Sequence, residues 1–141
     1  MDNFGKVEFK HFELTEAFRI GHRKIDGDHR RIVEILNELI DACAARNFSL
    51  CDRKLNAFKT TLVQHFIDEI TIMTELNFID AYHNKLHDEF ELALDDLTGG
   101  YDTLVQWCSC IETILDKLIV TILTHDLKFA AHLAEIGYSD R

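Results

Sequence analysis

The chain has 141 residues, and its 47% hydrophobic content is enough to fill one core, so no second domain is required. Its 25 acidic residues outnumber its 15 basic ones and give a formal net charge of -10, which argues against nucleic-acid or anionic membrane surfaces as partners. The longest aliphatic run, Leu118-Ile119-Val120, is far shorter than a membrane span, and the N-terminus lacks the apolar core of a signal peptide. These features predict a single cytoplasmic domain over residues 1–141.

The spacing of apolar residues predicts helices along most of the chain. Proline is absent, only six glycines occur, and apolar residues recur every three or four positions. Residues 1–21 differ and are predicted to form an arm that packs down through its phenylalanines and ends at Gly21. In residues 22–141 we expect four helices. The first is capped by Asp26 or Asp28 and ends near Arg46, and the second is opened by a capping box of Ser49 and Asp52 and ends near Leu76. The third covers 80–97 and the fourth about 102–136. Four helices with short joints predict an all-α fold, an antiparallel up-down-up-down four-helix bundle with an N-terminal arm.

Two pairs of metal-binding side chains occur at helical spacing. His65 and Glu69 share one face of the expected second helix, and His83 and His87 share one face of the third, because residues four apart lie one turn above each other. Imidazole and carboxylate without thiolate suit iron, zinc or manganese, and a carboxylate can bridge two ions. A glutamate buried among apolar neighbours also needs a cation to compensate its charge. The two pairs therefore predict a metal site inside the bundle.

These motifs, in this order, resemble the hemerythrin family of non-haem di-iron proteins. Ile25-Asp26-Gly27-Asp28-His29 matches the family's Ile-Asp-x-x-His element, His65-Phe66-Ile67-Asp68-Glu69 with Met73 matches its His-Phe-x-x-Glu element, and His83, His87 and Phe90 match its His-x-x-x-His element. The similarity covers residues 20–133. The resemblance implies two non-haem iron ions, bridged by carboxylate and an oxygen species.

The expected fourth helix departs from the family's His-x-x-x-x-Asp spacing, and two registers remain open. If His125 is the histidine, the aspartate position holds Ala130; if Asp126 is the carboxylate, the histidine position holds Thr121. The second register is preferred because it keeps the preceding aliphatic residues on the family's apolar positions. In either register, one iron would have an altered or open coordination position. The predicted metal ligands are His29, His65, Glu69, His83, His87, His125 and Asp126.

The resemblance implies reversible binding of dioxygen or another small diatomic ligand, by a carrier, a store or a sensor. Many neutral imidazoles and few carboxylates favour the diferrous state, which the resemblance associates with this role rather than with substrate oxidation. No catalytic residue is predicted, because no acid or base beside a substrate pocket is visible. The first alternative is an enzyme-like role in oxygen, peroxide or nitric oxide chemistry, since an open iron position admits a small reactive ligand. The second alternative is a zinc-binding or metal-free structural bundle.

The remaining histidines and the cysteines receive no role in the metal site. For His22 and His132, a capping or surface position is expected. The four cysteines have no CxxC zinc spacing and are expected to be small buried or partly exposed residues; they are Cys43, Cys51, Cys108 and Cys110.

Overall fold

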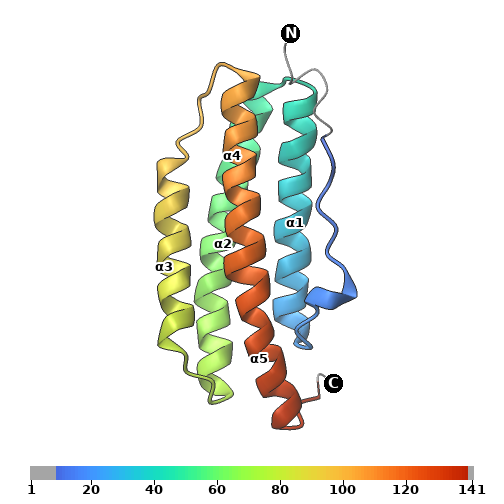
Figure 1. Cartoon of the computed structure of the whole chain (residues 1–141), viewed down its shortest axis with the longest axis vertical. Coiled ribbons are helices and arrows are strands. Elements are labelled where there is room, and N and C mark those ends of the chain that lie inside the picture. The colour runs from blue at the N-terminus through green and yellow to red at the C-terminus, as the bar shows by residue number, and fades with distance from the viewer. Residues whose placement is uncertain (1–8, 140–141) are drawn as a thin grey trace.

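The computed structural model describes residues 9–139, apart from the side chains of residues 120–122, and no strand occurs in this part of the chain. The α-helices are α1 (Arg23–Ala44), α2 (Phe48–Glu75), α3 (Ala81–Asp96), α4 (Leu104–Lys117) and α5 (Thr124–Glu135). A 3-10 turn, η2 (Glu16–Phe18), lies in the arm, and a π-helical segment, η3 (Leu118–Leu123), joins α4 to α5. The helices run along the long axis of the molecule, and α4, η3 and α5 form one continuous column (Figure 1). The predicted all-α fold is confirmed for these residues.

The core follows the apolar spacing that the sequence shows. On α1, Ile32, Leu36, Leu39 and Cys43 succeed one another at intervals of three or four residues, and each is at most 1% exposed. They pack in one cluster with side chains of α2, α3 and α4, which include Phe58, Leu62, Phe90, Trp107 and Ile114. Complete burial of each large apolar side chain stabilises the fold by about 1.5–3 kcal/mol. The shared core holds the helices at fixed positions along their length.

The start of α1 differs from the prediction that an aspartate caps it. His22 is the N-cap, and its ring nitrogen accepts a hydrogen bond from the backbone of Ile25 at 3.4 Å. Asp26 instead accepts the backbone N–H groups of Ile20 and Gly21, at 2.8 and 3.0 Å. Gly21 adopts a φ of 95°, which lets the chain turn sharply there from the arm into the helix. The expected capping role of His22 is confirmed, and Asp26 ties the arm to α1.

The start of α2 also differs from the prediction, because its N-cap is Asn47 rather than Ser49. Asn47 caps the helix through a hydrogen bond from the backbone of Leu50 to its side-chain oxygen at 3.2 Å, so Ser49 is already inside the first turn. The predicted Ser49–Asp52 capping box is therefore wrong. Asp52 instead accepts the backbone N–H of Gly100 at 2.6 Å, which joins α2 to the loop before α4.

The helices α3 and α4 begin close to their predicted starts. The Asp80 carboxylate caps α3 and accepts the backbone N–H of His83 at 3.2 Å, so the cap fixes the turn from which His83 projects. Thr103 and Gln106 form a capping box at the start of α4.

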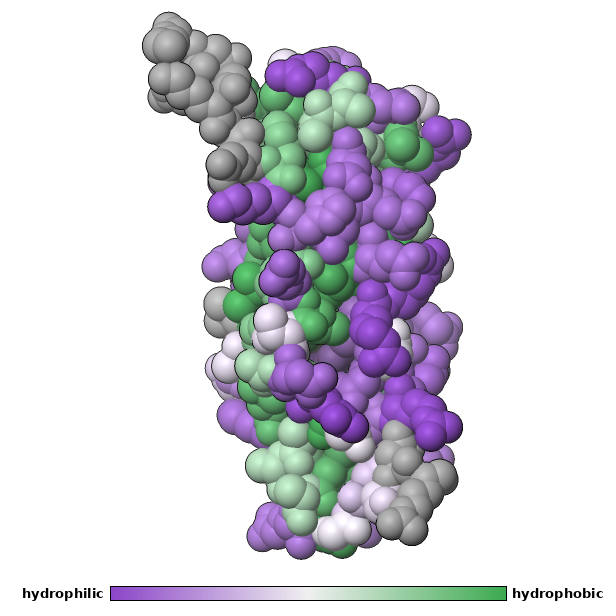
Figure 2. All heavy atoms as spheres, turned by 90° about the vertical axis from the view of Figure 1, so that its right-hand side faces the viewer, coloured by the Kyte–Doolittle hydropathy of each residue, from purple (hydrophilic) through white to green (hydrophobic). Residues whose placement is uncertain are grey.

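The described part of the arm, residues 9–21, packs down as predicted, and it does so along α1. Phe9, Phe12 and Phe18 contact the main core cluster, and Phe12 exchanges two backbone hydrogen bonds with the Asn37 side chain, at 2.7 and 3.1 Å. Figure 2 shows a face on which hydrophilic side chains predominate, with hydrophobic ones between them along the length of the molecule. None of the described helices is both long and apolar enough to cross a membrane.

The four cysteines are all buried and carry free thiols, as expected for small core residues. Cys43 at the end of α1 and Cys51 at the start of α2 place their sulfur atoms 3.3 Å apart. Burial raises the pKa of both thiols, and it raises the pKa of Cys110 to about 11. Cys43 lies about 21 Å along α1 from His29, at 1.5 Å per residue.

Candidate metal centre

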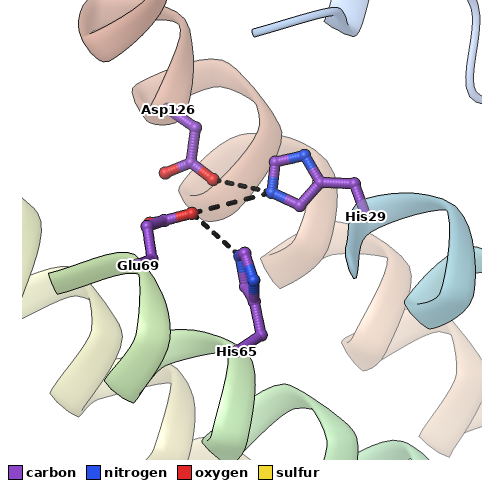
Figure 3. A group of neighbouring side chains, drawn as sticks. All are labelled: His29, His65, Glu69 and Asp126. Carbon is purple, nitrogen blue, oxygen red and sulfur yellow. Dashed lines mark ion pairs between the residues drawn. The ribbon is translucent and has the colours of Figure 1, made fainter. Parts of the chain in front are cut away.

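Six of the seven predicted ligands come together in the interior, from four helices. Two lie on α2, two on α3, one on α1 and one on α5, and each is at most 3% exposed. They are His29, His65, Glu69, His83, His87 and Asp126. Figure 3 shows four of them, with the side chains of α1, α2 and α5 pointing toward one another.

The Glu69 carboxylate lies between two pairs of histidines. Its Oε2 atom is 2.8 Å from His65 Nε2 and 3.7 Å from His29 Nε2. Its Oε1 atom is 2.7 Å from His83 Nε2 and 3.1 Å from His87 Nε2. One oxygen of the same carboxylate therefore faces each pair.

Asp126, on α5, contacts one histidine of each pair. Its Oδ2 atom is 3.1 Å from His29 Nε2, and its Oδ1 atom is 3.1 Å from His83 Nε2. Two groups of ligand atoms result, and within each group all atoms lie within 4.8 Å of one another. One group joins His29 and His65 to the two carboxylates, and the other joins His83 and His87 to the same two carboxylates.

Many polar atoms of these groups are buried without a hydrogen-bond partner in the described chain. A polar atom left in this state costs about 1–3 kcal/mol. The atoms are both ring nitrogens of His29 and of His87, His65 Nε2, Glu69 Oε2 and both carboxylate oxygens of Asp126. Cations would engage the Nε2 lone pairs and the carboxylate oxygens among these atoms and compensate two buried carboxylates, so the donor set fits one metal ion in each group. Imidazole and carboxylate donors without thiolate suit iron, zinc or manganese.

The pKa values of the two buried carboxylates shift in opposite directions. Burial opposes ionisation of Glu69, but contacts with four histidines outweigh it and hold the pKa of Glu69 well below its usual range. Burial and the nearby charge of Glu69 raise the pKa of Asp126 to about 6. Burial alone would lower the pKa of His65, yet contacts with Asp28 and Glu69 raise it to about 10. A metal ion entering this site has to displace protons, so binding depends on pH.

The π-helical segment η3 explains why Asp126 faces the interior. The core positions Ile111 and Leu118 of the α4 column are seven residues apart, and an unbroken helix would put position 125 on the same face. In η3, however, the backbone N–H of Thr124 bonds to the carbonyl of Ile119, five residues earlier. This wide turn adds one residue and rotates the following chain by about 100°. Position 126 therefore takes the inward place that position 125 would otherwise have.

The structure does not bring His125 into either group. Its ring is partly exposed and packs edge-on against Tyr82, with ring centroids 5.5 Å apart. The side chain of Thr121, which the preferred register placed at the histidine position, lies outside the described part of the structure. His132 contacts the end of α2, where its Nε2 atom lies 2.8 Å from the carbonyl oxygen of Leu76.

Sequence reasoning missed two residues that hold the histidines in place. Asp28 Oδ2 lies 3.0 Å from His65 Nδ1, on the side of the ring that faces away from Glu69. The ring of Phe66 stacks on His87, with centroids 3.9 Å apart and planes at 13°. Asp28 was expected only as a possible helix cap, and Phe66 was named only within its motif, because contacts between helices leave no spacing signal.

No model of a known protein family matches the chain. Among curated proteins, bacteriohemerythrins of the Pseudomonas aeruginosa strains LESB58, UCBPP-PA14 and PAO1 are each 27% identical to it over 81 residues, or 57% of this chain. The chain spans about half, 53%, of the length of these relatives. This similarity and the two metal-capable groups confirm the predicted resemblance to the hemerythrin family.

Proposed function

We propose that the chain is a di-iron protein that binds dioxygen reversibly, as a carrier, a store or a sensor. The main support is that Glu69 and Asp126 each direct one oxygen to each histidine pair, an arrangement suited to two ions that share two carboxylates. The similarity to bacteriohemerythrin supports iron rather than zinc or manganese. Iron would supply the electrons and the binding position for the diatomic ligand.

We also infer that the helices form an antiparallel up-down-up-down four-helix bundle within a single domain, with α4, η3 and α5 as the fourth helix. The short connection over residues 45–47 supports opposite directions for α1 and α2. In Figure 1 the colour sequence runs upward along α1, downward along α2, upward along α3 and downward along α4 and α5.

In this proposal the protein's own residues bind and isolate the irons. His29 and His65 would hold one ion, His83 and His87 would hold the other, and Glu69 and Asp126 would serve both groups. Because the ligands are at most 3% exposed, the protein shields the metal positions from bulk water. The two carboxylates also compensate part of the charge of the two cations.

One observation favours an enzyme-like role in oxygen, peroxide or nitric oxide chemistry as the second candidate. The groups contain four histidines, and His125 lies outside them, so each ion would have two imidazoles and two carboxylate oxygens. The family's additional histidine is not among these ligands. Fewer protein ligands leave more coordination positions for small reactive molecules.

Optical spectra of the iron-loaded protein separate the candidates. Under the proposal, the reduced protein holds close to two irons per chain, its spectrum changes on exposure to dioxygen, and the change reverses when dioxygen is removed under argon. A lasting change would favour the enzyme-like role. A protein that retains zinc but no iron, or that shows no response to dioxygen, would refute dioxygen binding.

A further inference from the structure

His65 differs from the other clustered histidines because carboxylates contact both of its ring nitrogens. Its Nε2 atom lies 2.8 Å from Glu69 Oε2, and its Nδ1 atom lies 3.0 Å from Asp28 Oδ2. The side chain of His65 is 1% exposed, whereas that of Asp28 is 19% exposed. Asp28 therefore touches His65 from the solvent side, and the metal groups lie on the inner side.

Asp28 is itself held by a charged neighbour. The Lys24 ammonium donates a hydrogen bond to Asp28 Oδ1 at 2.9 Å and lies 3.6 Å from Asp68 Oδ2. These side chains and His65 line a cavity of about 360 Å³ between α1 and α2. Since one oxygen of Asp28 faces Lys24 and the other faces His65, the carboxylate has a defined orientation.

The other histidines of the two groups have no such contact. The Nδ1 atoms of His29 and His87 are buried without a hydrogen-bond partner in the described chain. In the described chain, the contacts of His83 with carboxylates all involve its Nε2 atom. His87 is oriented by stacking on Phe66 instead. Among the described residues, a carboxylate therefore lies behind one histidine of the His29/His65 group and behind neither histidine of the other group.

A carboxylate that accepts the second ring N–H of a metal-binding histidine does two things. It fixes the ring so that the other nitrogen points at the metal, and it makes that nitrogen a stronger donor. Loss of such a partner typically weakens metal binding by about 10- to 100-fold. We propose that Asp28 is a positioning residue that makes the two metal positions unequal, so that a divalent metal fills the His29/His65 position before the His83/His87 position. This inference rests on the proposed two-metal function.

Titration of the metal-free protein with Co²⁺, against a competing chelator and followed by the cobalt absorption bands, tests the proposal. The wild type should show two classes of binding with different affinities. Asp28→Asn keeps the size of the side chain and should weaken the tighter class by about 10- to 100-fold while leaving the weaker class unchanged. Asp68→Asn is the matched control, because it removes the same charge from the same cavity but its side chain contacts Lys24 and Gln64 rather than His65.

Two single-ligand variants assign the classes to positions. His65→Ala should abolish the tighter class and His87→Ala the weaker one, with circular dichroism showing that each variant is folded. The proposal is overturned if Asp28→Asn titrates like the wild type, if Asp68→Asn has an equal effect, or if His87→Ala removes the tighter class. A wild type that binds fewer than two cobalt ions would instead contradict the proposed function itself.

Discussion

Replacing Glu69 by glutamine tests the shared carboxylate most directly. The amide has the same shape, but it is neutral and presents an NH₂ group where the carboxylate has its second oxygen. One of the two histidine pairs therefore loses one of its two oxygen donors, and the remaining charge of Asp126 alone has to compensate two cations. We expect Glu69→Gln to reduce the metal content from two ions per chain to one or fewer.

The same substitution should also destabilise the metal-free protein. Glu69 lies within 3.1 Å of the Nε2 atoms of His65, His83 and His87. Only the contact with His83, at 2.7 Å, is a hydrogen bond in the described chain, and a hydrogen bond to a charged partner is worth about 1 kcal/mol more than a neutral one. A chain of 141 residues has an unfolding entropy of about 0.3 kcal/mol/K, so the melting temperature should fall by about 3 °C.

Elemental analysis after gel filtration and thermal melting followed by circular dichroism measure the two effects. Glu38→Gln is the control, since Glu38 is also on a helix and pairs with Lys54 at 3.4 Å near the surface. It should keep both metal ions and lose at most about 1 kcal/mol. A Glu69→Gln protein that retains two tightly bound ions would refute the shared role of this carboxylate.

Three further outcomes follow from the site. Asp126→Asn should lose at least one metal ion by elemental analysis, whereas His125→Ala should keep both; the opposite result would support the other register. Chelation of the metal should lower the melting temperature by several degrees, because a metal ion present at 100 times its dissociation constant stabilises the native state by about 2.7 kcal/mol. An unchanged melting temperature would place the metal outside the folded core. The metal-free protein should lose stability between about pH 6.5 and 10. The pKa of His65 is higher in the folded protein than in the unfolded chain, so the stability that this histidine contributes is fully present below its pKa in the unfolded chain. That stability is lost as the pH rises through its pKa in the folded protein. Denaturant unfolding at pH 6 and pH 9.5 measures this, and equal or greater stability at pH 9.5 would contradict it.

The part of the site on α2 and α3 was predictable because its geometry is local. His65 with Glu69 and His83 with His87 each lie one helical turn apart, so an amphipathic pattern is enough to place each pair on one inward face. His29 required more than spacing, since it has no metal-binding partner one turn away on α1. Its assignment came from the resemblance of its motif to a known family.

The remaining details depend on alternative local structures and on contacts between helices, and the sequence does not decide between these. Asn47 and Ser49 are both good N-caps, and the choice of Asn47 changes the start of α2. The wide turn between Ile119 and Thr124 contains no proline or glycine to mark it, yet it decides that Asp126 faces inward. The contact of Asp28 with His65 joins α1 to α2 and depends on how the two helices pack.

The buried thiols provide an internal reporter of how the molecule opens. Cys43 and Cys51 are fully shielded from solvent at the turn between α1 and α2, about 21 Å along α1 from His29. A thiol reagent therefore reacts with them only during fluctuations that separate these helix ends, whereas release of metal reports fluctuations around the ligands. If labelling and metal release have the same rate and the same dependence on denaturant, the whole helical assembly opens as one cooperative unit. Faster labelling would identify the α1–α2 turn as a separate unit that unfolds while the ligand end stays closed.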